Sequence, residues 1–236
     1  MKLGRVLVSG LMVVTIPHGQ SKEFVLGKSV AANLEQRDGK IADPQFIAYL
    51  QSVAHRIAAA AGASPLEIHA TRGEKEYAQS LAGAFYISAA MLRRVQNEAE
   101  LAGLIAHEIA HRGDFVAQQS SGATIPLMTA ACVMASPMAG GNRRESEQDA
   151  TRTAIDLLKK AGYDPLPLLE FLSKLAYDHP EWSRAISPDD LMALRAPLEL
   201  EHAAAEYHLD SSEFHDQYNR VFPSPPKLAS PRLPPA

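Results

Sequence analysis

Three residues of one short motif have the types and spacing of a hydrolytic metal centre. His107, Glu108 and His111 form the pattern His-Glu-x-x-His. Residues four apart on a helix project side by side, so both imidazoles can reach one ion. In this motif two histidines bind zinc and the glutamate accepts a proton. We therefore predict that His107 and His111 are metal ligands and that Glu108 is the catalytic base.

The residues around the motif predict a helix that turns both histidines toward the protein interior. Asn97 suits the N-cap position, and Glu100 can bond back to the start of the helix. Gly113 is the expected C-terminal end, and Leu104 lies on the same side as the histidines. Buried imidazoles need a partner that offsets their desolvation, which a bound cation provides. The alternative is a polar helix face without any metal.

A third protein ligand must come from further along the chain, because catalytic zinc sites usually have three. Residues 112–144 contain no histidine and no glutamate. The next predicted helix begins near Asn142 and ends before Gly162, and it carries Glu145 and Asp149 on one face. Glu145 is the candidate ligand, with Asp149 as acceptor for an imidazole N–H. Spacing alone leaves equally open that Glu145 only caps the helix at Asn142.

The composition is that of one globular domain. The chain has 236 residues, of which 46% are hydrophobic and 21% charged, enough for one sizeable core. A net charge of −4 without a long basic run argues against nucleic acid as the principal partner. The single cysteine, Cys132, excludes an internal disulfide. We expect a domain over residues 21–222, followed by a proline-rich disordered tail at 223–236.

The N-terminal segment indicates export. Lys2 and Arg5 accompany an apolar run from Val6 to Ile16, which resembles a secretory signal over residues 1–20. No clear cleavage pattern follows, so an uncleaved anchor or a simple strand stays open. A second apolar stretch, residues 125–138, is too short to span a bilayer comfortably. We predict a periplasmic or other cell-envelope location, with residues 1–16 or 125–138 as possible membrane contacts.

Two strands are predicted ahead of the metal helix. They are Leu66–Ala70 and Ala84–Ser88, separated by the polar segment Thr71–Gly83. An extended segment just before such a helix can form a sheet edge to which a peptide adds as a further strand. It is equally consistent with a strand that only covers the core. On the first interpretation the substrate-binding residues are Ala84, Phe85 and Tyr86.

Several motifs together resemble the HtpX-type family of zinc metallopeptidases, which includes the CAAX prenyl endopeptidases and soluble periplasmic proteases. The matching stretches are Asn97–His111, Glu145-x-x-x-Asp149, Ala161–Pro165 and His179-Pro180. The resemblance implies a predominantly helical α+β fold, a zincin-like core with a small sheet. It also implies one Zn²⁺ per chain with Glu145 as third ligand, and a role for His179 in stabilising the transition state.

The predicted function is a zinc-dependent endopeptidase acting on protein or peptide substrates in envelope quality control. One segment departs from the family: Tyr77–Gly83 stands where the family usually has Asn-Ala-Phe-Ala-Leu-Pro-Gly-Gly. Because of that departure, the alternative is a zinc-stabilised, proteolytically weak or inactive binding or chaperone-like envelope protein.

Overall fold

The computed structural model describes residues 22–63, 66–120, 143–183, 185–202 and 206–223. The predicted signal at 1–20, the apolar stretch 125–138 with Cys132, and nearly all of the predicted tail lie outside these ranges. None of the helices in the described ranges is long and apolar enough to cross a membrane.

The elements confirm the predicted α+β class. In chain order they are α1 Lys22–Asp38, α2 Pro44–Ala60, β1 Glu67–Thr71, β2 Ala78–Leu81, β3 Ala84–Ser88, α3 Ala89–Leu92, α4 Glu98–Ser120, α5 Arg143–Ala161, α6 Leu166–Asp178, α7 Pro188–His202 and α8 Ser212–Val221.

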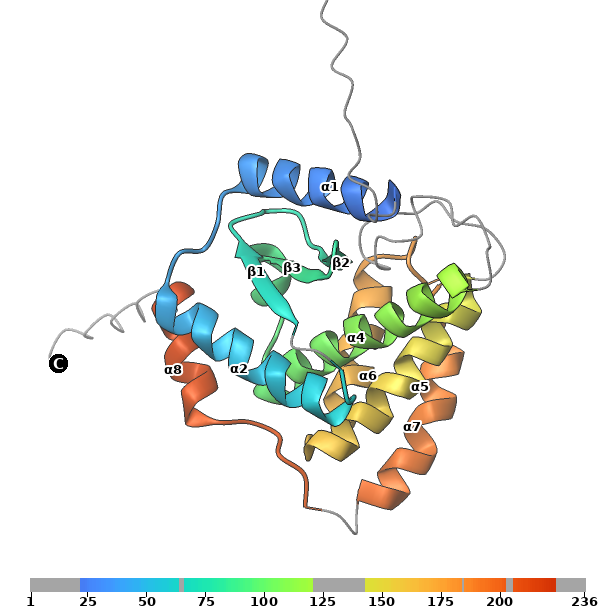
Figure 1. Cartoon of the computed structure of the whole chain (residues 1–236). Coiled ribbons are helices and arrows are strands. Elements are labelled where there is room, and N and C mark those ends of the chain that lie inside the picture. The colour runs from blue at the N-terminus through green and yellow to red at the C-terminus, as the bar shows by residue number, and fades with distance from the viewer. Residues whose placement is uncertain (1–21, 64–65, 121–142, 184, 203–205, 224–236) are drawn as a thin grey trace, which may run out of the picture.

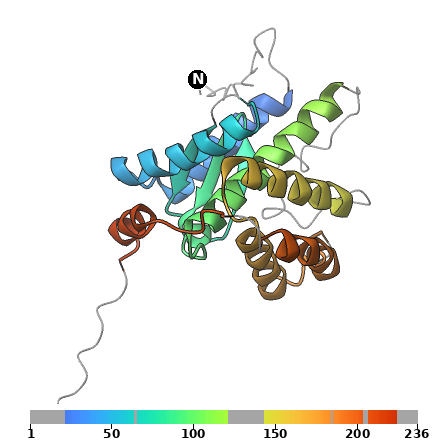
Figure 2. The same ribbon diagram turned by 90° about the horizontal axis from the view of Figure 1, so that it is seen from below.

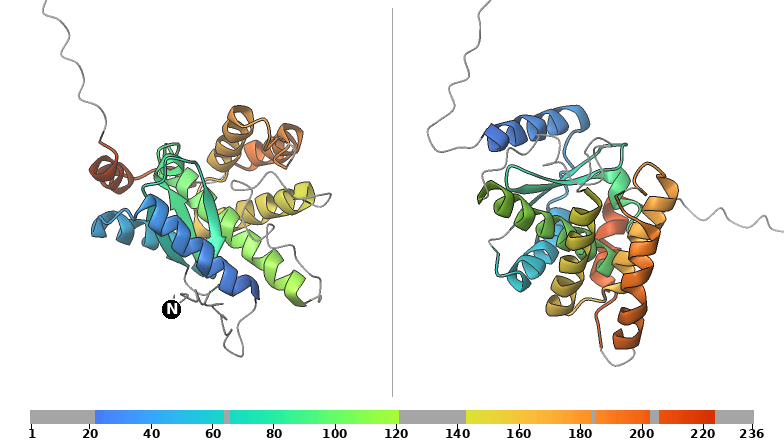
Figure 3. Two further views of the ribbon diagram at one scale, coloured as in Figure 1. Left: turned by 90° about the horizontal axis from the view of Figure 1, so that it is seen from above. Right: turned by 90° about the vertical axis from the view of Figure 1, so that its right-hand side faces the viewer.

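A three-stranded sheet lies between helices. Its order is β1-β3-β2, with β1 parallel and β2 antiparallel to β3. Helix α1 covers one face, while α2 and α4 lie against the other (Figure 1; Figure 3). Alternation along β3 explains both contacts: Tyr86 packs with Leu34 of α1, whereas Phe85 and Ile87 belong to the main core. The central strand is therefore buried on both faces.

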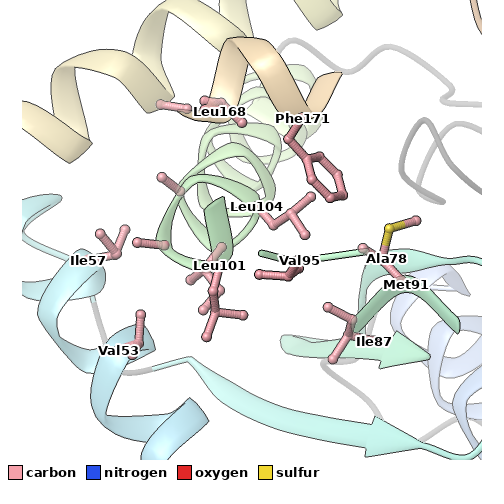
Figure 4. Packing of buried hydrophobic residues seen from close by; sticks show 14 of the residues in the cluster. Val53, Ile57, Ala78, Ile87, Met91, Val95, Leu101, Leu104, Leu168 and Phe171 are labelled. Carbon is pink, nitrogen blue, oxygen red and sulfur yellow. The ribbon is translucent and has the colours of Figure 1, made fainter. Parts of the chain in front are cut away.

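Helix α4 is central to the main core. Figure 4 shows its Leu101 and Leu104 lying between Ile57 of α2 and Phe171 of α6. The approach of α6 is close, because a Cβ at Gly103 would lie 2.9 Å from the Cβ of Leu168. Helices α5, α6 and α7 continue the bundle beyond α4 (Figure 2). The helix that carries His-Glu-x-x-His is thus held by α2, β2, α5 and α6.

Asn97 is the N-cap of α4 as predicted, but Glu100 bonds the amide of Gln96 and not that of the cap residue, and the C-terminal end of the helix differs from its prediction. The side chain of Asn97 accepts a hydrogen bond from the Glu100 amide at 2.8 Å. Glu100 in turn accepts from the amide of Gln96 at 2.7 Å. The predicted end at Gly113 is wrong, because α4 continues to Ser120. One glycine inside a helix costs only about 1 kcal/mol relative to alanine, which neighbouring packing can exceed.

The segment predicted as a polar connection, Thr71–Gly83, contains strand β2. This strand is defined by its hydrogen bonding to β3. It was not predicted because its polar residues Gln79 and Ser80 interrupt the apolar pattern expected of a strand. A two-residue turn, Ala82-Gly83, then joins β2 to β3, and both residues have positive φ angles, 48° and 89°. Turns of this kind match the twist of a hairpin but strain a residue that carries a Cβ.

Replacing Ala82 with glycine is expected to stabilise the protein. Glycine removes the left-handed strain at φ 48° but adds freedom to the unfolded chain, so we expect a net gain of about 0.5 kcal/mol. The reverse change next to it, Gly83→Ala, should lower stability by about 1 kcal/mol. Urea unfolding of both variants measures this. Equal effects of the same sign would contradict the turn conformation.

A buried carboxylate ties the start of α4 to the C-terminal part of the chain. Glu98 is 3% exposed and accepts hydrogen bonds from Tyr163, at 2.6 Å, and from Ser211. The adjacent amide, Ala99 N, donates to the Leu209 carbonyl at 3.0 Å. Burial alone would raise the pKa of Glu98, but the hydrogen bonds from Ser211 and Tyr163 outweigh it and lower the pKa below its usual value.

The Glu98 contacts predict a pH dependence of stability. A pKa lowered in the folded state gives stability that is present above the unfolded-state pKa, about 4.3, and lost as the pH falls through the folded-state pKa. Glu98→Gln should therefore be less stable than wild type at neutral pH, and the gap should narrow in acid. Urea unfolding across this pH range measures the gap. The exposed Glu199→Gln serves as control; a constant Glu98→Gln gap would exclude this role for Glu98.

Candidate metal centre

Helices α4 and α5 pack along each other and bring three possible ligands together. These are His107 and His111 of α4 and Glu147 of α5, whose ligand atoms all lie within 4.8 Å of one another. Oε2 of Glu147 is 3.2 Å from Nε2 of His111 and 3.7 Å from Nε2 of His107. The two imidazole rings stand edge to face with centroids 4.7 Å apart. Two histidines a helical turn apart thus face one carboxylate from the neighbouring helix.

The surroundings favour the neutral form of His107. His107 is 3% exposed and Glu147 5%, while His111 is partly exposed. Burial, together with the nearby His111, holds the pKa of His107 well below its usual value. A neutral imidazole has a lone pair to offer, as a metal ligand must.

The structure corrects the predicted third ligand. Glu145 is exposed on α5, whereas Glu147 is buried beside the histidines. Asp149, predicted to accept an imidazole N–H, is also exposed and pairs with Arg152 at 3.0 Å. The predicted pair does share one face of the helix, but that face is turned to solvent. Glu147 therefore replaces Glu145 in the candidate ligand set.

A signal for the correct face was present in the sequence. Ala150, Ala154 and Leu158 are the buried stripe of α5 and repeat at helical spacing. Extended one turn back, this stripe reaches Glu147 and misses Glu145. The carboxylate that continues an apolar stripe is the one directed at the neighbouring helix. Weighting the apolar face above the spacing of the two acids would have selected Glu147.

Sequence reasoning also missed Thr151, one turn after Glu147 and on the same face. Its buried hydroxyl donates to the Glu147 carbonyl at 2.8 Å and lies 3.3 Å from Nε2 of His107. The polar group beside an imidazole is therefore this hydroxyl and not the carboxylate of Asp149. No acid marks the position, so a search for paired carboxylates passes over it.

The other predicted catalytic residues have different surroundings. Glu108 is buried within α4, 1% exposed, between the two histidines in sequence. His179 caps the C-terminal end of α6, and its Nε2 lies 2.9 Å from Oε2 of Glu76. Its ring stacks on Trp182 with centroids 4.1 Å apart. Within the described ranges, the recorded contacts of His179 are with these neighbours and Glu181, not with the His-His-Glu cluster.

The predicted substrate-binding strand is not a sheet edge. Ala84, Phe85 and Tyr86 lie in β3, the central strand, which pairs with β1 on one side and β2 on the other. All three are buried. Their backbone groups are used within the sheet, so an added strand cannot pair there. The missed strand β2 occupies the edge instead.

The three side chains fit a zinc ion. Two imidazole nitrogens and a carboxylate oxygen form a common donor set for catalytic zinc, with bonds of about 2.0–2.2 Å. Tetrahedral bonds of that length separate neighbouring donor atoms by about 3.3 Å. The two distances from the Glu147 carboxylate, 3.2 Å and 3.7 Å, are close to this separation, and all three donor atoms lie within 4.8 Å of one another.

Comparison with known proteins agrees with the geometry. Residues 44–187, more than half of the chain, match the model of peptidase family M48. The chain belongs to peptidase family M48. Its resemblance to the HtpX-type metallopeptidases is thereby confirmed, and membership supports a metalloprotease. The matched region runs from the start of α2 to just before α7 and contains the whole His-His-Glu cluster.

Among curated proteins the chain is similar to β-barrel assembly-enhancing proteases. It is 27% identical to that of Yersinia pestis, across 75% of this chain and 41% of the relative. It is 28% identical to that of Escherichia coli K12, across 68% of this chain and 38% of the relative. The chain thus spans less than half the length of these M48-like relatives.

Proposed function

We propose that this M48 chain is a zinc-dependent endopeptidase with His107, His111 and Glu147 as metal ligands. The observation that carries the proposal is that one buried imidazole, one partly exposed imidazole and one buried carboxylate converge from adjacent helices. Both imidazoles direct Nε2 at the same carboxylate oxygen, as ligands of one ion would. The His-Glu-x-x-His order also places an acid next to the first ligand.

The residues of the chain divide the chemistry between them. A zinc ion held in the cluster would act as a Lewis acid toward the scissile carbonyl and the attacking water. Glu108, adjacent to His107 and buried, would take the proton of that water and deliver it to the departing amine. His179, once protonated at both ring nitrogens, would donate a hydrogen bond to the oxygen on which negative charge develops.

The outer edge of β2 supplies a docking strand for a peptide. Ser88 N donates to Tyr77 O at 3.0 Å, so Tyr77 and Ser88 form a hydrogen-bonded pair of the antiparallel ladder. By alternation, Ala78 and Ser80 direct their N–H and C=O groups away from β3. No recorded backbone hydrogen bond from the described part of the chain reaches those groups. Ala78 is buried and Ser80 is partly exposed, so an extended substrate would meet β2 at Ser80, on the strand that packs on α4.

The other edge of the sheet is closed. Ile41 N donates to Ala70 O at 2.9 Å, and Arg72 N donates to Gly39 O at 3.0 Å, which pairs part of β1 with the chain after α1. The amide side chain of Gln51 bonds both Leu66 O and Ile68 N. A side chain thus takes the place of a neighbouring strand, and β2 is left as the edge for substrate.

We propose that the substrates are envelope proteins, because the chain is similar to proteases named for β-barrel assembly. A protein substrate follows from the peptidase family. Unfolded chains are suitable substrates, because an added strand must be extended and have unpaired backbone groups.

Digestion of casein by the purified full chain tests the function. We expect cleavage inside the casein chain, its loss with a chelator, and its recovery on addition of Zn²⁺. Elemental analysis should give one zinc per chain. Binding of casein without cleavage, with zinc present, would reject the endopeptidase and favour a zinc-stabilised binding protein.

A further inference from the structure

His179 belongs to a chain of charged groups that joins three parts of the fold. Its Nε2 lies 2.9 Å from one oxygen of Glu76, and the other oxygen of Glu76 lies 2.7 Å from Nε of Arg94. Arg94 also contacts Asp178 at 2.7 Å. Glu76 precedes β2, Arg94 follows α3, and Asp178 and His179 end α6. The start of the edge strand and the end of α6 are therefore tied together.

The His179 ring is fixed at its plane and at one edge. Trp182 stacks on the ring at an interplanar angle of 21°, and Glu76 holds the Nε2 edge. Rotation of the ring would disturb both contacts. The opposite edge carries Nδ1, which is 3.5 Å from a carboxylate oxygen of Glu181. Glu181 is 54% exposed, so its side chain can move aside and leave Nδ1 for another group.

We propose that Glu76 and His179 form a carboxylate–imidazole dyad. Glu76 is a positioning residue that accepts the Nε2 hydrogen bond, and Nδ1 of His179 is the nitrogen that meets the substrate. Nδ1 carries no proton in this neutral tautomer, so it takes one from solvent before it donates to the developing negative charge. A carboxylate bound to one ring nitrogen selects the tautomer and stabilises the positive charge when the other nitrogen is protonated. Arg94 forms an ion pair with the second oxygen of Glu76 and so favours this orientation of the carboxylate. This inference rests on the proposed function, because it assumes that His179 acts in hydrolysis.

The backbone next to Glu76 is anchored and leads directly to the docking strand. The Tyr77 amide donates to Ser88 Oγ at 3.1 Å, and the Tyr77 hydroxyl donates to Asp38 at 2.8 Å. Ala78, the first residue of β2 with outward backbone groups, follows at once. The docking strand thus begins two residues after the carboxylate that orients His179.

Two measurements on the zinc-loaded full chain test the dyad. Nitrogen-15 NMR of labelled histidines, with His179 assigned through His179→Asn, reports which ring nitrogen carries the proton. We expect the Nε2–H tautomer in wild type and a mixture of tautomers in Glu76→Gln, whose amide can either accept or donate. Casein hydrolysis by Glu76→Gln should show kcat reduced roughly 10-fold to 100-fold, with KM changed less than about twofold.

Glu74→Gln is the matched control, since Glu74 lies in the same loop but pairs with Arg93 at 3.1 Å. It should leave both the tautomer and kcat unchanged. If Glu76→Gln does not fold, Glu76→Asp, which is one methylene shorter, should give the same tautomer change. An Nδ1–H tautomer in wild type, an unchanged tautomer in the Glu76 variants, or equal kcat losses in the Glu74 and Glu76 variants would overturn the dyad. An inactive wild type with the expected tautomers would reject the proposed function and leave the Glu76–His179 pairing supported.

Discussion

Glu147→Gln is expected to lose the metal. A neutral amide is a far weaker zinc ligand than a carboxylate, and α5 would no longer supply a charged ligand beside the two histidines. Changing a group that merely orients a ligand reduces metal affinity by about 10-fold to 100-fold, so loss of the ligand itself should exceed about 100-fold. Competition with a chromophoric chelator measures zinc affinity, and elemental analysis measures the zinc retained after gel filtration.

Glu145→Gln is the control for this prediction. Glu145 lies two residues away in the same helix and carries the same charge, but it is exposed. The control should bind zinc as wild type does. Loss of zinc in Glu145→Gln with retention in Glu147→Gln would show that the exposed face of α5 turns inward in the loaded protein, and would overturn the His107–His111–Glu147 ligand set.

Glu108→Gln is expected to retain zinc and lose hydrolysis. Glutamine keeps the size of the buried side chain but cannot take a proton from water. General-base catalysis contributes roughly 10²-fold to 10⁴-fold, so casein cleavage should fall by about 10³-fold. Initial rates of casein cleavage and zinc content, measured on the same preparation, separate the chemical step from metal binding.

Two results would contradict the role of Glu108. Unchanged turnover in Glu108→Gln would remove this residue from the mechanism. Parallel loss of zinc and activity would make it part of the metal support instead. Wild type stripped of zinc by a chelator supplies the baseline for both comparisons, because its residual cleavage defines the rate without a metal.

Much of the fold was readable from local patterns. The cap formed by Asp43 before Pro44, with Phe46 N donating to Asp43 at 2.9 Å, marks the start of α2 in both sequence and structure. Strands β1 and β3 were predicted from their apolar residues. Strand β2 was not, because its ladder to β3 and its packing on α4 come from distant residues. That omission led to Ala84–Tyr86 being taken for the sheet edge.

The sequence by itself determined the metal helix: the spacing of His107 and His111 fixes both imidazoles on one side of any helix that contains them. The spacing of the acids did not decide which of them meets the histidines, because spacing leaves the rotation of α5 open; only its apolar stripe pointed to Glu147. The tertiary structure decided for Glu147, because burying the apolar stripe of α5 against α4 fixes that rotation. Likewise the partner of His179, Glu76, lies 103 positions away, and only the tertiary fold brings the end of α6 to the residue two positions before β2.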